Sequence, residues 1–183
     1  MWLSLDALFS MLLQAKPSGD RMKNLAAMLL AVLLVPCASA LAGPLDSSPL
    51  IGSWAVDVSR LPIPPQARPR SVTITFAATA GGTLTTHVDI VDGGGVESRA
   101  AGTSMLDGKP TPVTGSDEAD ISSAEMPVLN VLVLSLGKGG IPASTRVYAV
   151  AADGKTMIET VVYFWDRGQP VPPMRTNYFT RIR

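Results

Sequence analysis

The chain has 183 residues, with 15 basic and 15 acidic side chains, one histidine and one cysteine. A formal net charge of zero argues against nucleic acid as the main partner, because phosphate binding needs a positive surplus. One cysteine excludes an internal disulfide, and one histidine excludes a metal site built from several imidazoles. We therefore expect no metal and no other cofactor.

Residues 22–42 have the layout of a secretory signal peptide. A basic start (Met22–Asn24) precedes an uninterrupted apolar stretch (Leu25–Val35), and two overlapping A-x-A cleavage sites end at Ala40 and at Ala42. In a helix, the 11 residues of the apolar stretch span about 17 Å, well short of the roughly 30 Å hydrocarbon core of a bilayer. We expect a cleaved signal helix rather than a transmembrane anchor.

Cleavage after Ala42, which we favour over cleavage after Ala40, leaves a mature chain of residues 43–183, which we expect to be periplasmic or secreted and to have no stable membrane span. Cys37 is expected to leave with the signal peptide. Attachment of a lipid to Cys37 is the alternative, but Pro36 stands where a small residue normally precedes a lipidated cysteine. Residues 1–21 are interpreted as an extension from an upstream start codon, with translation beginning at Met22.

After residue 43 the sequence has the pattern of short strands rather than helices. Runs rich in Val, Ile, Thr and aromatic residues alternate with turn signals such as Asp92–Gly95. About eight or nine strands joined by short connections predict an all-β fold, an up-and-down antiparallel β-barrel of a single domain over 43–183, because closure removes exposed edges. The clearest strands are Leu50–Val58, Ser71–Ala77, Thr83–Val91, Val96–Met105, Val128–Leu136, Thr145–Ala151, Thr156–Trp165 and Arg175–Arg183.

Two proline-rich segments, Leu61–Pro69 and Gln169–Pro173, interrupt this pattern. Proline favours an extended, polyproline-like backbone and lacks the N–H that a sheet needs, so both segments are predicted to be stiff loops that limit stray edge pairing. The functional alternative is a rim or lid over the mouth of a barrel.

Gly52-Ser53-Trp54, at the start of the first predicted strand, resembles the G-x-W signature of the lipocalin and calycin superfamily. In that superfamily the Trp closes one end of the barrel and an Arg late in the chain stacks on it. Arg181 and Arg183 are the two positions here that match this Arg, and such a cation–π contact is worth about 0.5–2 kcal/mol.

The order of further motifs is similar to that of a family of small exported bacterial lipocalin-like β-barrel proteins of unknown function. These motifs are D-G-K-P-T-P-V-T-G at residues 107–115 and T-R-V-Y-A-V-A-A-D-G-K-T-M at residues 145–157. The resemblance covers about residues 52–180, and it departs from the family at residues 126–136, which are more apolar here. It implies a fold and an exported location but no reaction.

Four side chains on two predicted strands are candidates for binding a small apolar ligand: Arg146, Tyr148, Glu159 and Tyr163. In this interpretation the tyrosines line an aromatic pocket, and Glu159 and Arg146 act as polar anchors. The alternative is that the aromatic residues near the C-terminus, on both faces of their strands, are core. These are Tyr148, Tyr163, Phe164, Trp165, Tyr178 and Phe179.

Other reactive groups are sparse. His87 and Asp89 share a strand face, but the apolar residues of that strand lie on the opposite face, so His87 is expected to point to solvent. Glu97 and Arg99 are expected to form cross-strand charge pairs on the outside. The acidic residues 117–120 lack the spacing of a calcium loop and are interpreted as a solvated turn.

Together these patterns predict an exported lipocalin-like protein that binds a small apolar ligand or a partner in the cell envelope. The alternative is a cofactor-independent barrel enzyme acting on a lipid-like or aromatic substrate, with His87/Asp89 or Glu159/Arg146 as acid–base pairs. The sequence gives no indication of an oligomeric state.

Overall fold

The computed structural model describes residues 45–164 and 173–182, which form ten strands and three short 3-10 turns. The segments 1–21 and 22–42, Trp165, Arg183 and all of Gln169–Pro173 except Pro173 lie outside the described residues. Within the described ranges, no helix is long and apolar enough to cross a membrane. The strands are β1 (Gly52–Val56), β2 (Ser71–Thr79), β3 (Thr83–Val91), β4 (Glu97–Ser104), β5 (Thr111–Thr114), β6 (Ile121–Val128), β7 (Val131–Lys138), β8 (Ile141–Val150), β9 (Thr156–Tyr163) and β10 (Arg175–Arg181).

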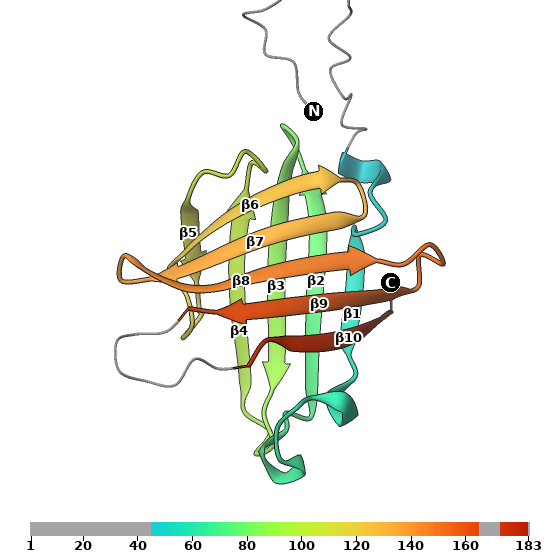
Figure 1. The fold of residues 1–183 in the computed structure, drawn as a ribbon, viewed down its shortest axis with the longest axis vertical. Helices are drawn as coiled ribbons and strands as arrows, with labels where there is room; N and C mark the ends of the chain where they lie inside the picture. Colours follow the sequence, from blue (N-terminus) through green and yellow to red (C-terminus); the bar gives the residue numbers. More distant parts are fainter. Residues whose placement is uncertain (1–44, 165–172, 183) are drawn as a thin grey trace, which may run out of the picture. The chain divides into compact units, whose positions relative to one another are not determined.

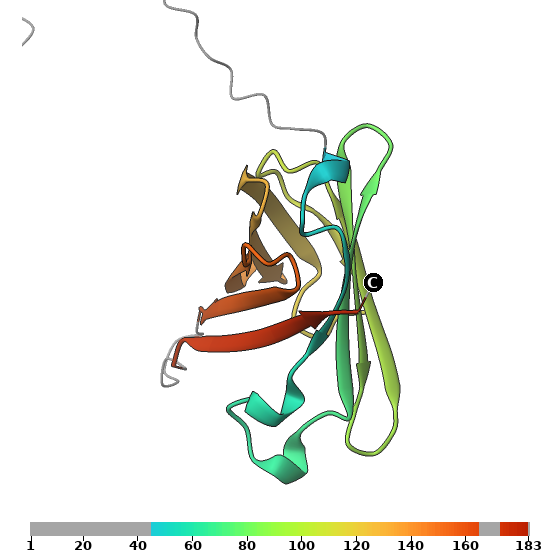
Figure 2. The same cartoon turned by 90° about the vertical axis from the view of Figure 1, so that its right-hand side faces the viewer.

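The ten strands form a closed up-and-down antiparallel barrel, as the sequence predicts (Figure 1). Each strand pairs with the next along the chain, and β1 pairs with both β2 and β10 to close the ring. Strands β2–β4 run across the direction of β6–β10, so the barrel consists of two crossed layers joined at their edges (Figures 1 and 2). The side chains between these layers form the core and line the interior.

The strand count is higher than predicted because two strands lack the expected apolar pattern. β5 lies within the D-G-K-P-T-P-V-T-G motif and pairs through only two residues on each side. β6 turns small side chains inward, such as Ser122 and Ala124, which give little hydrophobic alternation. The predicted strand Val128–Leu136 was wrong at its start, since residues 129–130 form the tight turn between β6 and β7.

Trp54 on β1 is completely buried. The guanidinium of Arg181 lies 4.3 Å from the centre of the Trp54 ring, and the indole N–H donates to the carbonyl of Leu50 over 2.9 Å. Arg181 also donates to the backbone carbonyls of Ile51 and Gly154, each over 2.8 Å. The stacking predicted for Arg181 is confirmed, and it ties the last strand to the first.

The first proline-rich segment, Leu61–Pro69, is extended only in part. Leu61, Pro64 and Arg68 have the predicted polyproline-like backbone angles, but residues 65–67 form a 3-10 turn. Arg68, directly after this turn, donates to the carbonyls of Ile63 (3.1 Å) and Leu61 (3.2 Å). Because one guanidinium holds two carbonyls of the same loop, the segment has a fixed shape, with Leu61, Ile63 and Pro69 turned toward the barrel interior.

Candidate functional site

The barrel encloses a cavity of about 480 Å³, which lies in the size range of small-molecule sites. Side chains from every strand and from the loops 57–70 and 115–120 contribute to its wall. Most of the wall is apolar, including Val72, Ile74, Leu84, Val88, Ile90 and Leu134. The interior is therefore only partly filled by the protein's own side chains, unlike a packed barrel core.

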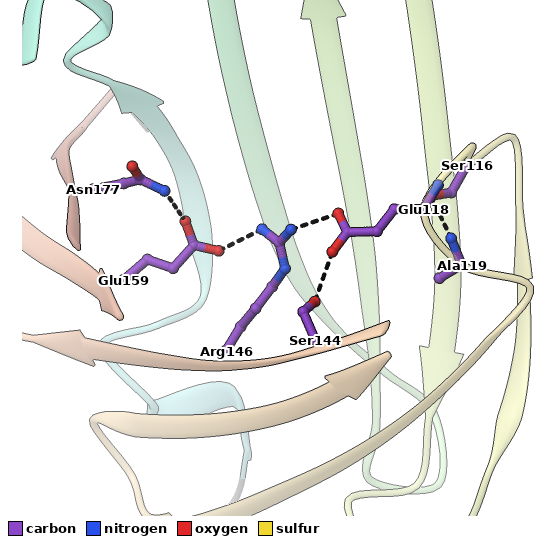
Figure 3. A network of polar contacts seen from close by, with 7 residues as sticks. All are labelled: Ser116, Glu118, Ala119, Ser144, Arg146, Glu159 and Asn177. Atoms are coloured by element: carbon purple, nitrogen blue, oxygen red, sulfur yellow. Dashed lines mark hydrogen bonds and ion pairs between the residues drawn. The ribbon is translucent and has the colours of Figure 1, made fainter. Parts of the chain in front are cut away.

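Five polar side chains inside the barrel form one continuous network (Figure 3). The Arg146 guanidinium lies between two carboxylates: Nη1 donates to Glu159 Oε1 over 2.7 Å, and Nη2 donates to Glu118 Oε2 over 2.5 Å. Ser144 donates to the other oxygen of Glu118 over 2.6 Å, and Asn177 donates to the other oxygen of Glu159 over 2.7 Å. One cation thus holds together two strands and a loop.

Strand alternation explains why these side chains point inward. On β8, Ser144, Arg146 and Tyr148 occupy every second position, and the register places Tyr148 opposite Glu159 on β9. Asn177 lies opposite Glu159 on the other neighbouring strand, β10. Glu159 therefore has inward-facing polar neighbours on both sides, which accounts for its burial at 2% exposure.

Two groups of this part of the cavity, Arg146 and Tyr148, have strongly raised pKa values. Burial alone would lower the pKa of Arg146, but the acidic groups Tyr148, Glu159 and Glu118 raise it above its ordinary value. Burial, reinforced by the negative charge of Glu159, raises the pKa of the Tyr148 hydroxyl well above its usual range. Arg146 is therefore a permanent cation and Tyr148 a neutral phenol at physiological pH.

The Glu118–Arg146 contact has a predicted pH signature. Burial would raise the pKa of Glu118, but the hydrogen bond and charge of Arg146 outweigh it and lower the pKa below the ordinary 4.5. Glu118 therefore stabilises the fold above about pH 4.5, and this contribution is lost as the pH falls through the lowered pKa. Because the side chain is 36% exposed, we expect Glu118→Gln to cost only about 1 kcal/mol at neutral pH.

Urea unfolding across a pH series checks this prediction. The difference in free energy of unfolding between the wild type and Glu118→Gln should disappear as the pH falls below 4.5. Glu97→Gln, the same change at an exposed position of β4, should show no such gap. A Glu118→Gln deficit that is constant at all pH values would contradict the role of the ionised carboxylate.

All four predicted ligand-binding residues line this one cavity: Arg146, Tyr148, Glu159 and Tyr163. Tyr148 also packs edge-on against Phe76, with ring centres 5.4 Å apart, and Tyr163 lies under Arg175, whose guanidinium is 4.6 Å from the ring centre. The expectation that late aromatics are core on both strand faces is wrong for the outer face. There Phe164 is 47% exposed, and Tyr178 lies under the guanidinium of Arg60.

Glu118 is a member of the site that the sequence did not indicate. The interpretation of residues 117–120 as a solvated turn holds for Asp117 and Asp120, which are exposed, but it is wrong for Glu118, which turns inward to pair with Arg146. The Ser116 hydroxyl fixes the turn by accepting from the N–H groups of Glu118 and Ala119, both over 3.2 Å. Asn177 was also missed, although its spacing from the buried Phe179 places both on one face of β10.

His87 and Asp89 do not line the cavity and do not form an acid–base pair. Asp89 pairs instead with Arg99 on the neighbouring strand, as expected for an outer charge ladder. The inner face of β3 is formed by other residues, among them Val88 and Ile90. Among the described residues, no group of three metal-ligating side chains comes together.

Comparisons with protein-family models, with curated proteins and with solved structures find no match to this chain. The functional argument therefore depends on the barrel and its cavity.

Proposed function

We propose that this chain is an exported lipocalin-like protein, periplasmic or secreted, that binds a small apolar ligand inside its barrel. The observation that carries the proposal is the cavity of about 480 Å³ within a closed barrel. A mostly apolar wall with a few convergent polar groups is the usual composition of a small-molecule site. The signal-peptide layout of residues 22–42 supports export, and the G-x-W strand supports the lipocalin-like assignment.

The proposed site is well suited to binding because it is already formed. Trp54 and Arg181 tie the first strand to the last, and Arg68 fixes the loop that carries Leu61 and Ile63. The Glu118–Arg146–Glu159 chain holds the loop between β5 and β6 to the far strands. Because the side chains and loops around such a site are already ordered, binding a ligand costs little conformational entropy of the protein.

Filling the cavity tests this function directly. Ala100 lies on the inner face of β4 and lines the cavity, so Ala100→Phe would place a ring where the ligand is proposed to lie. We expect this variant to bind the uncharged fluorescent dye N-phenyl-1-naphthylamine at least about tenfold more weakly than the wild type, since the two compete for one volume. Fluorescence titration of the mature chain measures the affinity.

Thr103→Phe is the matched control because it adds a ring to an exposed position of the same strand. It should bind the dye like the wild type. If the wild type does not bind the dye, or if Ala100→Phe binds it as tightly as Thr103→Phe does, the interior is not a binding site and the proposal is wrong.

A further inference from the structure

The polar network of the cavity restricts the chemical class of the ligand. Arg146 holds Glu118 and Glu159 together in it (Figure 3), and most of the remaining wall is apolar, with single hydroxyl groups such as those of Thr86, Ser98 and Ser104. A ligand that fills the cavity therefore needs an apolar body with a small polar end. The charge and the hydrogen-bonding capacity of that end are determined by what the network leaves unsatisfied.

The positive charge of Arg146 is already used by the protein. Both terminal nitrogens donate to carboxylates, Nη1 to Glu159 and Nη2 to Glu118. A carboxylate ligand would have to displace one of these partners or lie beside two negative charges in a poorly hydrated interior. Displacing Glu159 would leave a buried charge uncompensated, displacing Glu118 would give up its ion pair, and lying beside both carboxylates would be repulsive, so each arrangement disfavours an anionic head group.

Arg175 does not supply a free positive field either. It lines the same cavity, and its charge contributes to lowering the pKa of Glu118. Glu118 and Glu159 therefore balance Arg146 and Arg175, and the exposed Asp117 adds one further negative charge to the cavity wall. Nothing in this balance favours an anion.

Two polar atoms of the network are buried and have no hydrogen-bond partner among the described residues. They are Asn177 Oδ1, an acceptor, and Arg146 Nε, a donor. An unsatisfied buried polar atom costs free energy, and because both atoms are covered in this structure, a ligand recovers that cost only by shifting the side chain that covers them. A hydroxyl or an uncharged amide can donate to the first atom or accept from the second, whereas a carboxylate only accepts and an ammonium only donates.

We propose that the ligand is an uncharged amphiphile, with an apolar body and a hydroxyl or amide head, rather than an acid of the fatty-acid type. This inference rests on the proposed function, because it specifies the head group of a ligand bound in the same cavity. Arg146 is in this view a positioning residue: it holds the two carboxylates and does not bind an anion itself.

Competition against bound N-phenyl-1-naphthylamine at neutral pH tests the head group. Decan-1-ol, decanoate and decylamine have the same chain and differ only at the polar end. Decan-1-ol should displace the dye at a concentration at least about tenfold lower than either charged compound. Displacement by decanoate or decylamine at the same or a lower concentration than decan-1-ol would overturn the inference.

The variant Glu118→Gln tests whether the charge of Glu118 excludes anions, because it removes one negative charge and keeps the shape of the side chain. It leaves Nη2 of Arg146 without a carboxylate partner and removes one negative charge from the wall, so decanoate should bind about tenfold more tightly while decan-1-ol changes little. The control variant Glu97→Gln, at an exposed position of β4, should change the binding of neither decanoate nor decan-1-ol. If Glu118→Gln leaves decanoate unchanged, the charge balance does not select the ligand. Failure of the dye to bind at all would instead refute the proposed function, so the two failures are distinguishable.

Discussion

Replacing Arg146 by Met should lower the free energy of unfolding by about 3–5 kcal/mol at neutral pH. Met has a similar length but cannot pair with Glu159, which is 2% exposed, or with Glu118. Removing one member of a buried ion network leaves the opposite charges desolvated and unpaired, and this accounts for most of the expected loss. Urea unfolding followed by far-UV circular dichroism measures it.

Arg99→Met is the matched control, since Arg99 also pairs with a carboxylate, that of Asp89 on the next strand. Its side chain is 72% exposed, so the pair is solvated and its loss should cost less than about 1 kcal/mol. Adding Glu159→Gln to Arg146→Met should recover stability, because the buried negative charge goes with its partner. If Arg146→Met and Arg99→Met lowered the free energy of unfolding by the same amount, the ion pairs of Arg146 would be no less solvated than the outer pair of Arg99.

The sequence predicts the inward side chains of β8 and β9 because a strand has a period of two. Once Tyr148 is assigned to the interior, Arg146 follows on the same face, and Met157, Glu159 and Val161 follow in the same way on β9. The register between the strands, which makes Tyr148 and Glu159 neighbours, depends on the hairpin at residues 151–155. That hairpin carries a clear D-G turn signal, and so the pair could be placed from sequence.

Glu118 could not be found in this way because it lies in a connection, where no periodicity applies. Its inward direction depends on tertiary contacts of the loop. Gly115 adopts a φ of 69°, and a Cβ there would collide with the carbonyl oxygen of Arg99, so the loop leaves β5 by a route that only glycine permits. The Ser116 hydroxyl then turns the backbone before Glu118 reaches Arg146.

β5 and β6 were missed for a different reason. A strand is recognised by apolar alternation, and that pattern reports what the strand packs against. β6 faces the cavity with Ser122 and Ala124, so small side chains are sufficient there. The weak strand signal and the open interior therefore have the same physical cause: this part of the wall contributes little volume to the core.

Trp54→Ala should be the most damaging change where the first strand meets the last, with an expected loss of about 3–5 kcal/mol. The substitution leaves a cavity where a completely buried ring lay, removes the surface on which Arg181 stacks, and leaves the Leu50 carbonyl without its donor. Because the substitution removes the buried fluorophore, the fluorescence of the wild type and the variant cannot be compared directly. Urea unfolding should therefore be followed by far-UV circular dichroism.

Two further variants separate the parts of this effect. Trp54→Phe keeps a ring under Arg181 but loses the indole N–H, so it should cost about 1–3 kcal/mol, less than Trp54→Ala. Phe164→Ala removes an aromatic ring that is 47% exposed on the outer face and should change stability by no more than about 0.5 kcal/mol. If Trp54→Ala cost no more than Phe164→Ala, the stacked pair would be dispensable. In that case, the hydrogen bonds of Arg181 to the carbonyls of Pro49, Ile51 and Gly154 and the pairing of β1 with β10 would be sufficient to join the first strand to the last.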